Sequence, residues 1–142
     1  MRFFLPALLV CTLLLSACAT TSTSEHVLDM DDETQLQKRS YQSRVFETSD
    51  KAKVLRTIIS TLQDLGFVIE RADLVLGSVS GTKLDGINRT RITVSVRKKG
   101  SGRMLIRANA QFNVTPIKDP KQYQNFFASL EKALFLTAHA GE

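Results

Sequence analysis

Two stretches of alternating apolar and polar residues constrain the fold of this chain more than any other feature. In the first stretch, the side chains expected to face inward are Thr90, Ile92, Val94 and Val96. In the second stretch, they are Met104, Ile106, Ala108, Ala110, Phe112 and Val114. The polar, glycine-containing segment 98–102 separates the two runs and is typical of a β-hairpin loop. The alternation therefore predicts an antiparallel sheet with one buried face and one solvated face.

Two helical patterns supply apolar surface that could cover this sheet. The first has apolar side chains every three or four residues, at Ala52, Leu55, Ile58, Ile59, Leu62 and Leu65. Capping oxygens precede it in segment 48–50, and Gly66 stands where a left-handed cap can end a helix. The second begins at Asp119-Pro120, with proline at the first helical position. Its apolar stripe is Tyr123, Phe126, Phe127, Leu130 and Leu134.

Three shorter segments, 40–46, 67–70 and 77–83, are predicted to be additional strands, with a turn over residues 72–76. The resulting order of elements is β-α-β-β-β-β-α, and both helices need the same apolar face of the sheet. We therefore predict an α+β fold in which an antiparallel sheet carries two helices on one face. This arrangement resembles the TBP-like (TATA-binding-protein-like) and helix-grip-like classes of α+β folds.

The N-terminus has the pattern of a secretory signal. Arg2 precedes an apolar run over residues 3–15, which fits the apolar region of a signal peptide and is shorter than the roughly 20 residues of a membrane span. The sequence Leu15-Ser16-Ala17-Cys18 then resembles the lipobox of bacterial lipoproteins. This resemblance implies removal of residues 1–17 and attachment of a diacylglyceryl group to the Cys18 thiol. A conventional signal peptide, cut at another small residue, is the alternative.

The same resemblance implies a location. Ala19 follows the lipidated cysteine in place of the aspartate associated with inner-membrane retention, so we expect an outer-membrane protein that faces the periplasm. Residues 18–38 are polar and acidic, and we expect a lipidated N-terminus and a flexible tether there, with a helix near its end as one alternative. A single α+β domain is expected over residues 39–138, followed by a tail over 139–142.

The mature domain is predicted to have no catalytic, metal or cofactor site. Both cysteines, Cys11 and Cys18, belong to the signal region, so no thiol remains for a disulfide, a metal or a nucleophile. His26 and His139 lack neighbours at spacings that indicate catalysis or metal binding. The glycines of segment 77–86 precede no helix and form no phosphate loop. The formal net charge of +5 becomes +4 without Arg2, and we expect no nucleic-acid partner.

A candidate binding surface lies on the solvated face of the predicted sheet. It carries five arginines, with two lysines at the hairpin tip: Arg89, Arg91, Arg97, Arg103, Arg107, Lys98 and Lys99. Arginine binds phosphate and carboxylate bidentately, so these residues could dock anionic lipid or an acidic protein. An ordinary solvated face with interleaved acidic side chains is the alternative. Similarly, Tyr123, Phe126 and Phe127 could line a lipid cavity or simply pack the core.

A family resemblance extends over residues 39–138. The segment Asp64-Leu65-Gly66-Phe67-Val68-Ile69-Glu70 leads into a small-residue strand ending at Gly81, and the chain closes with the aromatic helix that starts at Asp119-Pro120. These features resemble uncharacterised proteobacterial outer-membrane lipoprotein domains. They are more distantly similar to the repeated domains of the C-type lipoprotein of the barrel-assembly machine, which has two such domains. The resemblance rests on structural residues and implies a fold more than a role.

Two functions remain open from the sequence. The first is a non-enzymatic adaptor or structural component of the cell envelope, held on the membrane by its lipid and docked onto an envelope protein complex or anionic lipid. The second is a carrier of lipid or a small hydrophobic ligand in a cavity between sheet and helices. A ligand cavity of at least about 300 Å³ would favour the carrier.

Overall fold

The computed structural model describes residues 34–139, and side chains up to residue 136. The predicted signal peptide (1–17), Cys18, His26, most of the predicted tether and residues 140–142 lie outside the described residues, as does the side chain of His139. The described elements are α3 (Gln35–Gln42), β1 (Ser43–Phe46), α4 (Lys51–Asp64), β2 (Val68–Asp73), β3 (Ser78–Asp85), β4 (Asn88–Lys98), β5 (Met104–Phe112), β6 (Thr115–Pro116) and α5 (Pro120–His139).

The strands form one antiparallel sheet in the order β1-β5-β4-β3-β2, with β6 paired to β5. The two alternating runs, β4 and β5, lie side by side at its centre. Val94 of β4 pairs with Ala108 of β5 and with Val79 of β3, and all three side chains are buried. This register places the apolar set of each strand on one face, so the α+β prediction is confirmed.

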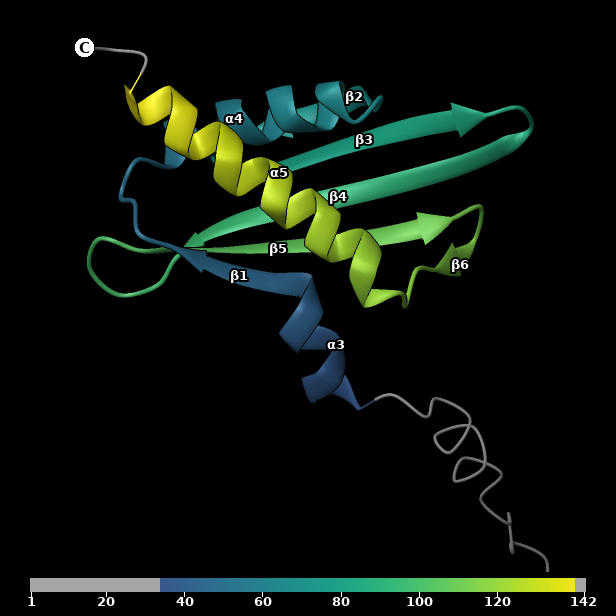
Figure 1. The fold of residues 1–142 in the computed structure, drawn as a ribbon, viewed down its shortest axis with the longest axis horizontal. Helices are drawn as coiled ribbons and strands as arrows, with labels where there is room; N and C mark the ends of the chain where they lie inside the picture. The colour runs from purple at the N-terminus through teal and green to yellow at the C-terminus, as the bar shows by residue number, and fades with distance from the viewer. Residues whose placement is uncertain (1–33, 140–142) are drawn as a thin grey trace, which may run out of the picture. The chain divides into compact units, whose positions relative to one another are not determined.

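Helices α4 and α5 cover the apolar face of the sheet (Figure 1). Val54, Ile58 and Leu62 of α4 belong to the same buried core as the inward residues of β3–β5. Helix α5 adds Phe126 and Leu130 to that core. The spacing of three and four residues read from the sequence therefore matches the faces that the two helices bury. None of the described helices is long and apolar enough to cross a membrane.

The segment before β1 differs from the prediction. Residues 40–42, expected to open the first strand, end helix α3, and β1 starts at Ser43. A capping box begins α3, because the Thr34 side chain accepts from the Gln37 amide while the Gln37 side chain accepts from the Thr34 amide. Tyr41 is buried, with its ring 5.1 Å from that of Tyr123. Helix α3 thus agrees with the alternative of a helix near the end of the tether, but it crosses residue 38, where we expected the tether to end.

Two strand ends also differ from the prediction. Strand β2 continues to Asp73, so the turn into β3 begins at Leu74 and not at Ala72. Strand β5 stops at Phe112, and Asn113 adopts a left-handed conformation with φ of 54°. The expected inward position of Val114 is therefore wrong, since its side chain is 89% exposed. Phe112 is itself 45% exposed at the edge of the helix layer.

Candidate functional site

The face of the sheet opposite α4 and α5 is mainly polar, with Leu84 of β3 and Leu105 of β5, opposite Arg97, as apolar members. It displays the side chains of β3, β4 and β5 that alternate with the core residues. Its middle consists of short hydroxyl and amide side chains. These are Ser78, Ser80, Thr82, Thr93, Ser95 and Asn109. We call this surface the open face, because no described element packs over it (Figure 1).

The structure separates the five predicted arginines. Arg89 and Arg97 lie at opposite ends of β4, about 26 Å apart at ~3.3 Å per residue. Arg91 and Arg107 lie between them, on β4 and β5. Arg103 is in the hairpin loop, one residue before β5, so its expected position on the sheet is wrong. The arginines therefore do not form one cluster.

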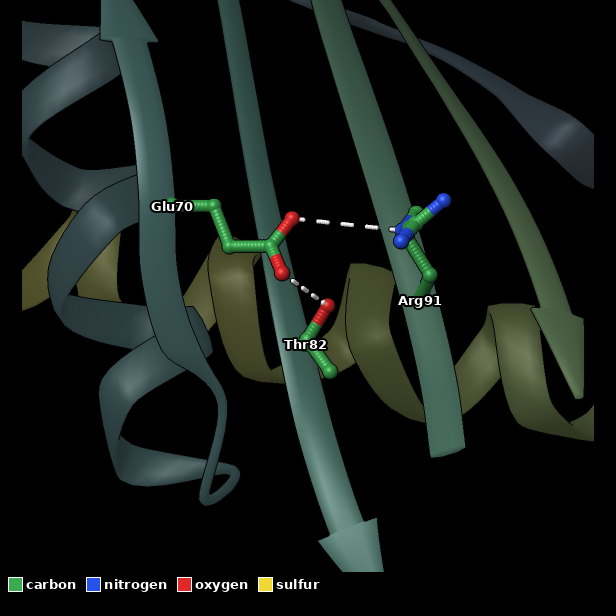
Figure 2. A network of polar contacts seen from close by, with 3 residues as sticks. All are labelled: Glu70, Thr82 and Arg91. Carbon is green, nitrogen blue, oxygen red and sulfur yellow. Dashed lines mark hydrogen bonds and ion pairs between the residues drawn. The ribbon is translucent and has the colours of Figure 1, made fainter. Parts of the chain in front are cut away.

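Arg91 has an acidic neighbour from another strand. Its Nε lies 3.9 Å from Glu70 Oε2, and the other carboxylate oxygen of Glu70 accepts a 2.7 Å hydrogen bond from Thr82 Oγ1 (Figure 2). Both charged side chains are a little over 40% exposed. Within the described part of the chain, the buried Nε of Arg91 has no hydrogen-bond partner. At Arg91, therefore, the structure fits an ordinary solvated face with an interleaved acidic side chain better than it fits a surface that binds anions.

Arg107 has different surroundings. Its Nε donates a 3.2 Å hydrogen bond to Ser43 Oγ on the edge strand β1, and Ser95 lies opposite it on β4. Arg97 is its diagonal neighbour on the open face, about 7–8 Å away. Among residues 34–136, no carboxylate lies within 4.0 Å of either guanidinium. Arg89 and Arg103 also lack an acidic partner among the described residues, but Arg97 and Arg107 are the two members of the predicted set that are diagonal neighbours on adjacent strands without one.

A groove of about 340 Å³ lies on the other side of the sheet, beneath the first half of α5. Its apolar lining includes Phe67, Ile92, Phe112, Tyr123 and Phe126. Its polar lining comes from Lys83, Asp85, Gln122 and Asn125. Of the three aromatic residues predicted to line a cavity or pack the core, only two line this groove. Tyr123 and Phe126 are buried and also line the groove, whereas Phe127 packs elsewhere, under the guanidinium of Arg44 at 5.4 Å.

Sequence reasoning missed the partners that define these surfaces. Glu70 lies beside the point where the pairing of β2 with β3 shifts, between Ile69 and Arg71, and it reaches Arg91 across the intervening strand β3. Ser43 was placed on the first strand, but its contact with Arg107 spans 64 residues. Within residues 34–139, no three potential metal ligands gather.

Comparison with known proteins gives no family. No family model matches the chain, and no curated protein matches it. Two similar solved structures are of the adenylate sensor from AMP-activated protein kinase, one with the ribofuranotide ZMP and one with ATP. They are 12% and 13% identical, cover 65% and 62% of this chain and 94% and 91% of their own, and have TM-scores of 0.47 and 0.46. Likeness at this level carries no functional argument.

Proposed function

We propose that this chain is an envelope lipoprotein that works as a non-enzymatic adaptor. Residues 1–17 are removed, Cys18 carries the lipid, and the domain faces the periplasm from the outer membrane. The open face docks an acidic segment of an envelope protein partner around Arg97 and Arg107. The observation that supports this docking site is the pair of neighbouring guanidiniums on an uncovered face, with no carboxylate in ion-pair distance among the described residues.

The chemistry of this site favours binding. Arg107 is held by Ser43, so one guanidinium edge is oriented before any partner arrives. Preorganisation of this kind reduces the entropy lost on binding. The adjacent Ser95 and Asn109 supply short hydrogen-bonding groups that allow a partner backbone to approach the sheet closely. A guanidinium binds a carboxylate bidentately, so an acidic segment matches both the charge and the geometry.

The test is purification of the acylated protein from detergent-solubilised membranes, with mass spectrometry of everything that accompanies it. The test variant combines Arg97→Glu and Arg107→Glu. The matched control combines Lys121→Glu and Lys132→Glu on the exposed side of α5, which changes net charge equally. We leave Arg91 unchanged, because a glutamate there would face Glu70 and destabilise the sheet.

The adaptor proposal expects a discrete protein partner with the wild-type chain and the lysine control. It expects loss of that partner with the arginine variant, whose far-ultraviolet circular dichroism and unfolding midpoint stay close to wild type. Equal recovery of the partner with all three proteins would count strongly against docking on the open face.

A second candidate, carriage of a small hydrophobic ligand, is favoured by the groove beneath α5. Its volume of about 340 Å³ reaches the low end of ligand pockets, which is ~300 Å³. Native mass spectrometry of the purified protein tests this function, with Phe112→Asp as the variant that places a charge in the groove. Stoichiometric lipid in wild type and none in the variant would support a carrier.

A further inference from the structure

The turn between β2 and β3 exposes three consecutive apolar side chains. Leu74, Val75 and Leu76 are 56%, 89% and 69% exposed. Single exposed apolar side chains are common on protein surfaces, whereas contiguous ones can mark a site of interaction with a protein or a membrane. Three together at the end of a sheet therefore require an explanation.

Hydrogen bonds fix the backbone of this turn. The amides of Leu76 and Gly77 donate to the side chain and carbonyl of Asp73, each at 2.8 Å. Lys51 Nζ donates to the Val75 carbonyl at 2.9 Å, and the Gly77 carbonyl accepts from the Val96 amide at 2.8 Å. Because the turn is held at both ends and in its middle, its side chains cannot fold back onto the core without breaking these bonds.

Basic residues lie at the same end of the sheet as the turn, whose own acidic side chain, Asp73, accepts from the Leu76 amide. The bond of the turn to Val96 places it at the end of the sheet from which the β4–β5 hairpin extends. That end carries exposed cations, and among the described residues no carboxylate lies within 4.0 Å of any of them. They are Lys98, Lys99 and Arg103. Lys51 adds a further positive charge directly beneath the turn.

We propose that this end of the domain, residues 74–76 with the basic hairpin, docks onto the surface of a bilayer that contains anionic phospholipid. Apolar side chains enter the boundary between headgroups and acyl chains, while lysine and arginine bind lipid phosphates at the same depth. A bilayer fits better than a protein, because three apolar residues at a projecting turn give far less than the roughly 800 Å² that each partner of a stable protein interface buries. The inference goes beyond the adaptor role, and it uses the proposed anchor only to keep the domain near a membrane.

Tryptophan fluorescence can test this inference directly, because the chain has no tryptophan. Val75→Trp reports on the docking turn. Ile87→Trp is the matched control, since Ile87 is 100% exposed in a turn at the opposite end of the sheet, about 30 Å away along β4. Each protein is reconstituted into vesicles of phosphatidylcholine alone or of phosphatidylethanolamine with phosphatidylglycerol, with lipids that carry a doxyl quencher on the acyl chain.

We expect lipid quenching of the residue 75 emission by more than about half in the anionic vesicles, because inserted residues sit ~5–10 Å into the interface. Residue 87 should be quenched in neither vesicle. Adding Lys98→Glu and Lys99→Glu to Val75→Trp should return its quenching to the level in neutral vesicles, whereas adding Lys121→Glu and Lys132→Glu should not. Equal quenching at residues 75 and 87, or none at 75, would overturn the inference.

Flotation of the same samples separates this result from the anchor. A protein with acylated Cys18 floats with both kinds of vesicle. Failure to float with neutral vesicles would contradict the proposed lipid anchor at Cys18. Quenching of residue 75 in anionic vesicles would still support the proposal that this end of the domain docks onto a bilayer.

Discussion

Gly77 links the β2–β3 turn to the central strand. Its φ is +71°, and a Cβ there would lie 2.6 Å from the Val96 carbonyl oxygen and 2.6 Å from Lys51 Cε. The lysine side chain can move, but the carbonyl belongs to the sheet. We therefore expect Gly77→Ala to lower the free energy of unfolding by about 3 kcal/mol or more, through backbone strain and displacement of β4.

Gly86→Ala is the control for this prediction. Gly86 also has a positive φ, +59°, but nothing lies within 4 Å of the added Cβ. Only the left-handed conformation is penalised there, by about 1–2 kcal/mol. Urea unfolding measures both variants, and equal losses would show that close packing at Gly77 has no effect.

The hydroxyl of the buried Tyr123 side chain makes three hydrogen bonds. The Oη donates to the Ile117 carbonyl at 2.9 Å and accepts from the Ala110 amide at 3.1 Å and from Gln42 Nε2 at 3.4 Å. We expect Tyr123→Phe to cost about 1–3 kcal/mol of unfolding free energy, because it leaves buried backbone groups unpaired. Ser60→Ala removes an exposed hydroxyl and should be nearly neutral in the same urea titration. A Tyr123→Phe protein with the same free energy of unfolding as wild type would show that these hydrogen bonds do not stabilise the fold.

Among the elements, helix α4 depends on the cap at its first turn. Asp50 is the N-cap, and its Oδ1 accepts from the Lys53 amide at 2.8 Å. We expect Asp50→Ala to lower the free energy of unfolding by about 1 kcal/mol. Ser49→Ala should change it by less than about 0.5 kcal/mol, because an exposed position beside a cap contributes little. Thermal unfolding of the pair distinguishes Asp50 from the neighbouring oxygens of segment 48–50.

The elements with strong periodicity could be predicted from the sequence. Alternation fixed the faces of β4 and β5, and spacing of three and four residues fixed the buried sides of α4 and α5. Helix α3 could not be found in this way, because its one buried residue, Tyr41, creates no period. The signal that was available is its capping box, in which Thr34 is followed three residues later by Gln37.

Periodicity also fails at strand ends. The pattern of alternation continues through Val114, but the chain turns at Asn113, whose side-chain oxygen accepts from the Arg89 amide at 2.9 Å. Asparagine tolerates the left-handed conformation that this turn requires. An isolated asparagine between apolar residues was too weak a signal to end the strand before residue 113.

The candidate site was only partly predictable, because local alternation gives the face of a residue but not its partners from other strands. Alternation placed Arg91, Arg97 and Arg107 on the solvated face, which the register of β4 and β5 bears out. Which of them carries uncompensated charge depends on strands distant in sequence, since β2 brings Glu70 to Arg91 and β1 brings Ser43 to Arg107. Strand order and register across the sheet determine these contacts, and no local pattern encodes them.

At the scale of the whole molecule, we propose two surfaces for two partners. In this proposal the open face binds an acidic protein through Arg97 and Arg107, and the end with Val75 and the hairpin lysines binds an anionic bilayer. Both roles presuppose that the domain is kept at a membrane. The anchor at Cys18 is thus the premise on which the functional account depends most.

The most direct test of that premise is the intact mass of the protein extracted from bacterial membranes. We predict a chain that begins at Cys18, with the added mass of a diacylglyceryl thioether and an amide-linked acyl chain, and a Cys18→Ala protein without this mass. A chain that retains residues 1–17, or one that begins at another residue with an unmodified Cys18 thiol, would contradict the account.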